Sequence, residues 1–440
     1  MKRSPALLAL LFFGAAALPA ADAATRVAIR AGRLIDGKGD RPISPAIVLI
    51  EGDRIVAAGA AVTIPPDARV IDLGQATLLP GLIDMHDHLT AVPENLGYKG
   101  LGLSIPREAL YGAANARKTL EAGFTSVRNV GASGFSDVAL RDAIAAGDIP
   151  GPRMLVSGPP LGITGGHCDN NLLPSEFHFR EGGVADGPWE ARAKVREVVK
   201  YGADLIKICA SGGVLSKGDQ PGTPQYSPEE MKALIEEAHR LGRRVAAHAH
   251  GTQSIKEAIV AGVDSIEHAS LIDEEGIRLA RERGTFLVMD IYNDDYILEQ
   301  GEKVGMLPES IEKEKALGKL QRENFQRAVR AGVRMAFGTD GGVYPHGQNA
   351  KQFAYMVQYG MTPMQAIQAA TSNAAELAGW KDRVGTIEVG KLADVIAVAS
   401  DPLADIRALE NVGFVMKGGA VVKNEIPAPP PEATPRKRPS

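Results

Sequence analysis

Two histidines one residue apart stand in the first third of the chain. His86 and His88 lie within residues 80–90, directly after an apolar run that is typical of a strand. Alternate residues of a strand point to the same face, so the two imidazoles project together. Two imidazoles aimed at one point suit a divalent transition metal, although so short a pair also occurs as two ordinary histidines. The choice depends on which other side chains converge with them.

Further polar side chains end apolar runs later in the chain. They are Asn129, Lys207, His248, His250, His268 and Asp340. A lysine inside an apolar strand is costly to bury without a partner or a chemical role, so Lys207 is the hardest to treat as structural. The histidines can be satisfied core residues, and Asp340 can be a turn aspartate between glycines. Because so many polar residues stand at the ends of predicted strands, one shared site is favoured over a set of unrelated residues.

The elements that must position these residues alternate between strand and helix. From about residue 79, short apolar runs alternate with helical patterns that end at a glycine, as in the helix 190–201 before Gly202 and the strand 205–208. This rhythm predicts parallel strands in βα units. About six to eight such units predict an α/β fold of the TIM-type (β/α)8 barrel class, in which functional residues lie at the C-terminal ends of the strands.

Both ends of the chain differ from the middle in their predicted secondary structure. Residues 24–78 and 383–424 are rich in short strand-like runs and turns. We expect them to pair into one small β-sandwich domain that flanks the barrel over residues 79–382. Residues 425–440 are rich in proline and predict a disordered tail.

The first residues carry the pattern of an export signal. A positive start at Lys2 and Arg3, an apolar run over residues 6–18 and small residues over 21–23 predict a signal peptide over residues 1–23. The apolar run is too short to span a membrane. We therefore expect an exported protein, periplasmic or secreted, with no membrane attachment after cleavage.

Composition gives no indication of a nucleic-acid partner and leaves the state of the two cysteines open. The net charge is −4, and 45% of the 440 residues are hydrophobic, so nothing indicates nucleic acid as a partner. The two cysteines, Cys168 and Cys209, can form one disulfide in an oxidising compartment or remain two buried thiols. The sequence does not decide between these states.

Taken together, the motifs resemble the amidohydrolase superfamily of metal-dependent hydrolases. The resemblance rests on residues 80–88, Lys207, His248, His268, residues 338–340 and the returning β segment 384–394. Residues 164–167, 207–213 and 340–347 are similar to the imidazolonepropionase-like or prolidase-like dipeptidases of that superfamily and to its ochratoxin-degrading members. The resemblance covers nearly the whole chain that follows the signal.

The resemblance implies two zinc ions per chain, bridged by a carboxylated Lys207 and a hydroxide. The implied ligands are His86, His88 and Asp340 for the first ion, His248 and His268 for the second, and Lys207 for both. Two adjacent dications lower the pKa of bound water. Asp340 would take the proton of the hydroxide and pass it to the leaving amine. The choice of His248 over His250 as a ligand rests on the family pattern alone.

The resemblance also implies substrate contacts. In similar dipeptidases, residues at the places of His167 and Tyr226 bind the substrate carboxylate or carbonyl oxygen, which makes His167 a catalytic candidate as well. Tyr226 can instead serve helix-cap packing. His250, Tyr292 and His346 are further pocket candidates.

These observations favour a dinuclear zinc hydrolase that releases a C-terminal amino acid from a dipeptide or an N-acyl amino acid such as ochratoxin A. The alternative is a hydrolase of cyclic amides, as in imidazolonepropionase or dihydroorotase. Lys207 argues against the single-metal deaminases of the superfamily, and a non-catalytic barrel would lack a ligand that this chain retains. The expected partner is a small-molecule or dipeptide substrate, and relatives of this type often form homo-oligomers.

Overall fold

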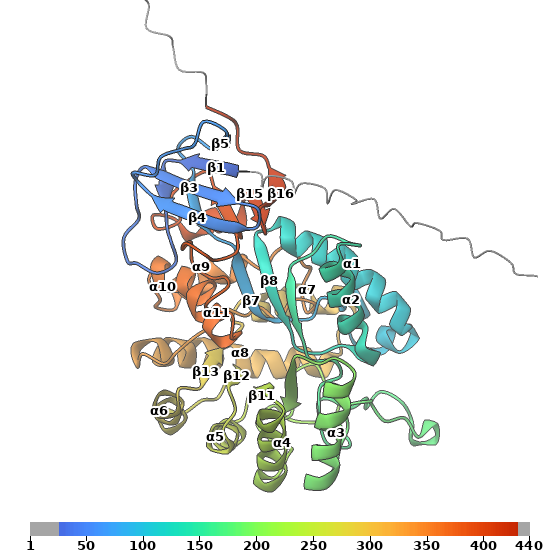
Figure 1. Cartoon of the computed structure of the whole chain (residues 1–440). Helices are drawn as coiled ribbons and strands as arrows, with labels where there is room; N and C mark the ends of the chain where they lie inside the picture. The colour runs from blue at the N-terminus through green and yellow to red at the C-terminus, as the bar shows by residue number, and fades with distance from the viewer. Residues whose placement is uncertain (1–25, 430–440) are drawn as a thin grey trace, which may run out of the picture.

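The computed structural model of the chain describes residues 26–429. The expected signal peptide and most of the expected tail lie outside these residues. Figure 1 shows a small β region at one end, made from the beginning and the end of the described chain, above a larger α/β region. No helix within residues 26–429 is long and apolar enough to cross a membrane.

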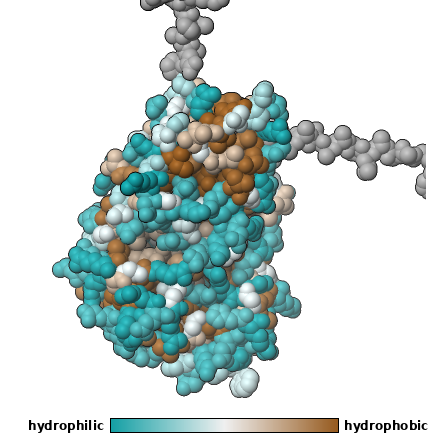
Figure 2. Space-filling view, turned by 60° about the vertical axis from the view of Figure 1, so that its left-hand side comes forward, coloured by the Kyte–Doolittle hydropathy of each residue, from teal (hydrophilic) through white to brown (hydrophobic). Residues whose placement is uncertain are grey.

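The small β region consists of two sheets. One has the order β4-β3-β1-β5, with β1 (Arg26–Ala31), β3 (Ala46–Glu51), β4 (Arg54–Gly59) and β5 (Arg69–Asp72). The other has the order β16-β15-β14-β6-β2, with β2 (Arg33–Leu34), β6 (Thr77–Pro80), β14 (Val395–Val398), β15 (Val412–Lys417) and β16 (Ala420–Asn424). Apolar residues of both sheets, such as Ile29 and Phe414, bury one shared cluster. Figure 2 shows an apolar area on the surface at this end of an otherwise mostly hydrophilic face.

The two ends of the chain meet inside the second sheet. Strand β6 pairs antiparallel with β14, with Leu79 opposite Ile396. Gly81 then connects β6 to the first strand of the α/β region, and a Cβ atom at Gly81 would lie 2.1 Å from Thr125 Oγ1. Only glycine allows this close approach, which brings the small β region directly against the larger one.

Parallel strands form the centre of the α/β region. The strands β7 (Leu82–Asp87), β8 (Phe124–Asn129) and β9 (Arg153–Val156) make one sheet. A second sheet contains β10 (Leu205–Cys209), β11 (Arg244–Ala249), β12 (Ser265–His268) and β13 (Phe286–Val288). Helices that follow the strands cover their outer side (Figure 1).

The helices agree with the helix–glycine rhythm of the sequence. They are α1 (Ile105–Glu121), α2 (Ser136–Ala146), α3 (Pro188–Lys200), α4 (Pro228–Arg240), α5 (Thr252–Ala261), α6 (Glu274–Arg283), α7 (Asn293–Val304), α8 (Pro308–Arg330), α9 (Lys351–Gln358), α10 (Pro363–Ala369) and α11 (Ser372–Leu377). Ser227 caps α4 in a capping box with Glu230, as its position before Pro228 predicts. Gly262 and Gly284 end α5 and α6 in the left-handed conformation that glycine favours.

The parallel strands do not form one closed eight-stranded barrel. Residues 334–337, a mostly apolar run within the expected barrel, make an isolated bridge between Met335 and Leu287. On this side Leu287 N donates to the Arg334 carbonyl at 3.0 Å and Ala336 N donates to the Leu287 carbonyl at 3.1 Å. On the side of β7 the Phe337 carbonyl accepts from Met85 N, but Phe337 N donates to the Ala369 carbonyl at 2.9 Å, so α10 takes a donor that a continuous ladder with β7 would need.

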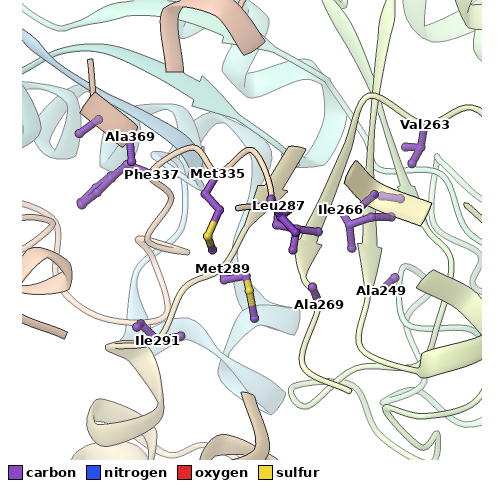
Figure 3. Close-up of a cluster of buried hydrophobic side chains, with 14 of the residues drawn as sticks. Ala249, Val263, Ile266, Ala269, Leu287, Met289, Ile291, Met335, Phe337 and Ala369 are labelled. Carbon is purple, nitrogen blue, oxygen red and sulfur yellow. The ribbon is translucent and has the colours of Figure 1, made fainter. Parts of the chain in front are cut away.

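Apolar side chains fill the interior between strands and helices. Figure 3 shows Ile266, Leu287, Met289, Met335 and Phe337 packed in one cluster from successive strand segments. Burial of this apolar surface is the main stabilising contribution of the region, at roughly 25 cal/mol per Å². The cluster fixes the strand ends on which the polar residues lie.

Candidate metal centre and active site

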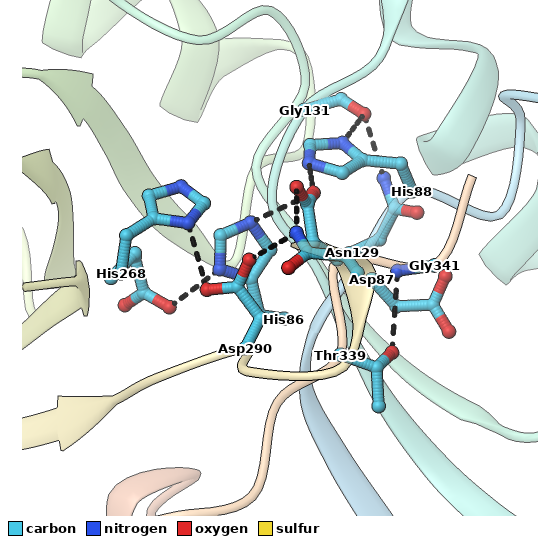
Figure 4. A network of polar contacts seen from close by, with 12 residues as sticks. His86, Asp87, His88, Asn129, Gly131, His268, Asp290, Thr339 and Gly341 are labelled. Carbon is cyan, nitrogen blue, oxygen red and sulfur yellow. Dashed lines mark hydrogen bonds and ion pairs between the residues drawn. The ribbon is translucent and has the colours of Figure 1, made fainter. Parts of the chain in front are cut away.

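The first group of converging residues comes from β7 and from the segment after residue 338. Asp340 Oδ1 lies 3.4 Å from His86 Nε2 and 3.3 Å from His88 Nε2. We call His86, His88 and Asp340 the first ligand group; their donor atoms lie within 4.8 Å of one another. Both imidazoles therefore contact the same carboxylate oxygen, and Figure 4 shows His86 and His88 in one polar network. The His-x-His spacing on a strand therefore brings the pair together as expected.

The second ligand group consists of His248, His250 and His268, whose donor atoms also lie within 4.8 Å of one another. The rings of His250 and His268 stack at 4.6 Å, and His248 meets His268 edge-on at 4.6 Å. The structure thus brings His248 and His250 into the same group, and only the family pattern favoured His248 over His250 as the ligand. His248 Nε2 lies 3.2 Å from the Gly212 carbonyl, so its Nδ1 is the nitrogen left for a ligand.

The two groups adjoin through Asp290, a residue that the sequence analysis missed. His86, His268 and Asp290 form a third set of donors within 4.8 Å of one another. His268 Nδ1 lies 2.8 Å from Asp290 Oδ1 (Figure 4). Burial, together with the charge of Asp340, raises the pKa of Asp290 to about 8. Asp290 follows β13 directly, so the strand-end rule that found the other residues could have found it too.

The histidines of both groups are oriented by acceptors behind them. Nδ1 of His88 lies 3.2 Å from the Gly131 carbonyl, and Nδ1 of His250 lies 2.7 Å from Ser270 Oγ. An acceptor at Nδ1 fixes the tautomer and leaves Nε2 free to bind a metal. Nδ1 of His86 faces Glu267 Oε2 at 3.1 Å as an ion-pair contact, outside hydrogen-bonding geometry. The imidazoles are thus held in the orientation that a metal site needs.

A buried ion pair supports the first group and was also missed. Arg128 Nη2 donates to Glu267 Oε1 at 2.8 Å, and both side chains are nearly fully buried. Burial opposes ionisation, but the Arg128 charge and His86 hold the pKa of Glu267 below its ordinary value. Glu267 therefore faces His86 as an anion. A charged residue inside an apolar strand was the available signal, as it was for Lys207.

The charge states of the second group suit metal binding. Burial and the neighbouring cationic groups lower the pKa of His248, His250 and His268 well below the ordinary value. Neutral imidazole is the form that binds metal, and protonation competes with binding. Buried neutral imidazoles beside a carboxylate form a donor set that fits divalent transition metals such as zinc.

Lys207 lines the cavity into which both ligand groups open. Its side chain is 3% exposed, and burial lowers the pKa of its ammonium to about 8. Among the described residues, no carboxylate lies within 4.0 Å of its nitrogen to form an ion pair. The sequence expectation that Lys207 is buried without an ordinary partner agrees with this environment.

Two of the residues that carry ligand atoms have unusual backbone conformations. His268 and Asp340 have φ values of +67° and +55°. Residues other than glycine adopt this left-handed region at a cost of about 1 to 3 kcal/mol, and such residues cluster at functional sites. The surrounding packing thus holds both ligand-bearing turns in a set conformation.

The two ligand groups open into one cavity of about 580 Å³. His167 lines it, and its ring stacks on His248 at a centroid distance of 4.1 Å. Burial lowers the pKa of His167 to about 4, and Nδ1 lies 2.8 Å from Ser216 Oγ. His167 therefore faces the cavity as a neutral imidazole beside the ligand groups.

A disulfide joins the loop of His167 to the strand of Lys207. Cys168 and Cys209 are bonded, with their Cα atoms 6.0 Å apart. The question that the sequence left open is thus answered by the structure. The bond holds residues 167 and 168 against the end of β10.

Three expected substrate contacts do not reach the cavity. Tyr226 is 1% exposed and packs in the apolar core, because Gln225 N donates to the Ala210 carbonyl and Ser227 caps α4, which turns the tyrosine inward. The Tyr292 hydroxyl accepts from Lys351 Nζ at 3.1 Å. His346 lies between the Ala91 carbonyl and Asp87. None of these three expected residues lines the cavity, whereas His167 and His250 do.

Comparison with known proteins identifies the family. Residues 77–422 match the amidohydrolase family. The chain belongs to this family and is a hydrolase that acts on amide bonds. The resemblance drawn from the motifs is thereby confirmed.

Several relatives match over most of the chain. The chain is 36% identical over 431 residues to "Ochratoxinase" of Aspergillus niger, which covers 91% of this chain and 88% of that protein. The structure of a Xaa-Pro dipeptidase with bound methionine matches with a TM-score of 0.85 at 39% identity, covering 91% of this chain and 100% of that chain. The A. niger ochratoxinase structure matches with a TM-score of 0.81 at 35% identity, covering 92% and 96%.

A more distant relative is the imidazolonepropionase of Symbiobacterium thermophilum, 24% identical over 417 residues, which cover 86% of this chain and 89% of that protein. The family and its solved structures imply a TIM-type barrel with a small additional domain. Within residues 26–429 the parallel strands of this chain form two sheets rather than one closed ring.

Proposed function

We propose that the chain is a dinuclear metal hydrolase that cleaves the amide bond to a C-terminal amino acid. The observation that carries this proposal is the overlap of the ligand groups. His86 belongs to the first group and His268 to the second, and both belong to the set that contains Asp290. Two ions held by these groups would therefore be neighbours.

The residues of the chain have distinct roles in this proposal. His86, His88 and Asp340 would hold one ion, and His248 and His268 would hold the other, with His250 or Asp290 beside them. Lys207 would be a ligand shared by both once its amine is carboxylated by carbon dioxide, and its pKa of about 8 provides a share of neutral amine for that reaction. Such an ion pair would supply a more acidic water and polarise the substrate carbonyl oxygen.

The remaining chemistry belongs to protein side chains. Asp340 accepts a proton at its carboxylate and returns it to the leaving amine, since this carboxylate borders both the ligand groups and the cavity. His167 binds the carbonyl or carboxylate oxygen of the substrate from the cavity wall. In the free protein burial keeps the ring neutral, and its one N–H, at Nδ1, donates to Ser216 Oγ, whose own proton goes to Asp219. A negatively charged substrate oxygen beside Nε2 would favour the protonated ring, which can donate to it.

The names of the relatives support the substrate class. The ochratoxinase and Xaa-Pro dipeptidase relatives both match over about nine-tenths of this chain. We therefore favour dipeptides and N-acyl amino acids, ochratoxin A among them. The imidazolonepropionase relative, at 24% identity, supports hydrolysis of a cyclic amide as the second candidate.

We further propose that the enzyme is exported and acts outside the cytoplasm as a homo-oligomer. The signal pattern at residues 1–23 motivates the location. The Cys168–Cys209 disulfide is compatible with an oxidising compartment.

Metal analysis combined with a substrate panel tests the proposal. Protein prepared with zinc and bicarbonate should contain two metal equivalents per chain and release a free amino acid from dipeptides or N-acyl amino acids. Two equivalents with activity only on lactams would select the cyclic-amide alternative. One equivalent or none would contradict the bridging role of Lys207.

A further inference from the structure

The cavity has a second polar region beside the metal centre. On this side its wall comes from α7 and α8, where Asn293, Asp294 and Glu314 line the same cavity as the histidines. Asp294 is 2% exposed and Glu314 is 4% exposed. Within residues 26–429, neither carboxylate belongs to a group of candidate metal ligands. Their presence in the cavity wall therefore needs another explanation.

Buried oxygen atoms in this region lack donors. Among the described residues, Asn293 Oδ1, Asp294 Oδ2 and Glu314 Oε1 have no hydrogen-bond partner. Arg322 Nε lies 3.2 Å from Asp294 Oδ2 but outside hydrogen-bonding geometry. A buried acceptor without a donor costs about 1 to 3 kcal/mol, and more when it is charged. The two adjacent carboxyl groups can meet this cost by sharing a proton, and a cationic ligand that donates hydrogen bonds here would replace that proton.

Gly318 of α8 lies against both carboxylates. A Cβ atom at this position would lie 2.7 Å from Glu314 Oε1 and 3.0 Å from Asp294 Oδ2, which is closer than side chains pack. Glycine at position 318 therefore lets the two carboxyl groups lie next to each other beside the helix.

Carboxyl groups outnumber cations in this region. Arg322 contacts Asp294 at 3.2 Å and Asp295 at 2.7 Å, so one cation serves two carboxylates. Within the described chain, Glu314 has no cationic partner within 4.0 Å. Burial and the mutual repulsion of the carboxylates raise the pKa of Asp294 to about 7 and that of Glu314 well above its ordinary value. The pair therefore holds at least one proton near neutral pH, and a bound cation would take the place of that proton.

We propose that Asp294 and Glu314, with Asn293, form a subsite for a positively charged nitrogen of the substrate, an ammonium or a guanidinium group. This inference rests on the proposed function, because the substrate would occupy the same cavity. Asn293 Nδ2 donates to Asp290 Oδ2 at 2.5 Å and lies 3.4 Å from Asp340 Oδ2. One side chain thus separates the subsite from the ligand groups, so a cation there belongs to a residue that flanks the scissile amide.

Pairs of substrates that differ in one charge test the subsite. The pairs are Ala-Lys against Ala-norleucine, Lys-Ala against norleucine-Ala, and Ala-norleucine against its N-acetyl form. We expect kcat/KM to favour the cationic member of one pair by at least about tenfold, since buried charged hydrogen bonds discriminate strongly. The pair that responds identifies the nitrogen as the C-terminal side chain, the N-terminal side chain or the α-amine.

Variants with a matched control separate binding from folding. Glu314→Gln and Asp294→Asn keep the shape of the side chains and should reduce the preference for the cationic member at least about fivefold, mainly through KM. Glu312→Gln, two residues away on an exposed face of α8, should keep the wild-type preference. A purely structural role of the acidic pair would instead lower turnover of both members of a pair alike.

The outcomes for the subsite and for the proposed function can be told apart. Wild-type protein that cleaves the neutral members but shows no preference in any pair would overturn the subsite and leave the proposed function intact. Protein that cleaves no member would contradict the proposed function, and calorimetric binding of L-lysine against L-norleucine would then decide. Tighter binding of lysine that Glu314→Gln removes supports the subsite, and equal binding overturns it.

Discussion

The two ligand groups are prepared for metal by different means. The first group includes the anion Asp340, and a second anion, Glu267, lies 3.1 Å from Nδ1 of His86. The second group consists of three histidines, which burial keeps neutral. Charge therefore attracts an ion to the first group, whereas the absence of competing protons favours binding at the second. The charged first group and the neutral second group line one cavity and lie next to each other.

The largest expected effect comes from removing the anion of the first group. Asp340→Asn should lower kcat/KM by about 10³-fold or more, because the variant loses both a ligand charge and the proton acceptor. Circular dichroism should be unchanged, since Asn keeps the shape of the side chain. Wild-type turnover in this variant, measured on any cleaved amide, would refute the role of Asp340.

A smaller loss is expected from the charge behind His86. Glu267→Gln should weaken metal affinity by roughly 10- to 100-fold, as removal of outer partners of ligand histidines does elsewhere. Chelator titration with metal analysis would show one of two equivalents leaving early. Simultaneous loss of both equivalents would mean that the two groups do not differ as described.

The matching change behind the second group should have less effect. Ser270→Ala removes the acceptor of His250 Nδ1, which lies 2.7 Å away. The partner is neutral, so we expect less than about a tenfold change in metal affinity. An effect larger than that of Glu267→Gln, measured by the same chelator titration, would reverse the comparison of the two groups.

The smallest predicted effect concerns the stability of the metal-free protein. His248, His250 and His268 have depressed pKa values when folded, so the unfolded chain binds more protons below about pH 6.5. Their contribution to the free energy of unfolding should therefore fall as the pH drops from 7 to 5. The pKa of His86 is raised, because Asp340 and Glu267 outweigh its burial, and this contribution acts in the opposite direction.

Asp290, Asp294 and Glu314 also have raised pKa values and act in the same direction as His86, so the histidine contribution is measured as the difference between wild-type protein and His250→Gln. One depressed histidine contributes up to about 1.4 kcal/mol per pH unit to this difference. Thermal unfolding of both chelator-treated proteins across this pH range measures it, with zinc-loaded protein as the control. A difference that stays constant between pH 7 and 5 would contradict the depressed pKa of His250.

Local periodicity explains which site residues could be predicted from the sequence. His86 and His88 share a strand face, and Lys207 interrupts an apolar strand, so each could be recognised from its own neighbours. Arg128 and Glu267 give the same kind of signal, but 139 residues separate them and their pairing depends on the arrangement of the strands. Long-range contacts of this kind are what sequence periodicity does not encode.

The orientation of side chains after a strand was less predictable. Tyr226 follows the glycine-rich loop after β10, as expected, yet backbone hydrogen bonds at Gln225 and the cap at Ser227 turn it into the core. The alternation of strands and helices was also recognisable, whereas the interruption near Phe337 depends on the distant Ala369 carbonyl. Local patterns determine element type, and tertiary contacts determine these details.

The pairing of β6 with β14 affects how the chain is completed during synthesis. Leu79 pairs with Ile396, which the ribosome adds more than 300 residues later, so this pair can form only near the end of synthesis. The α/β region between them can begin to form first, while the apolar face of β6 still lacks its neighbour. A chain released before residue 395 would therefore expose this strand edge, and we expect such truncated chains to aggregate rather than to persist as smaller active enzymes.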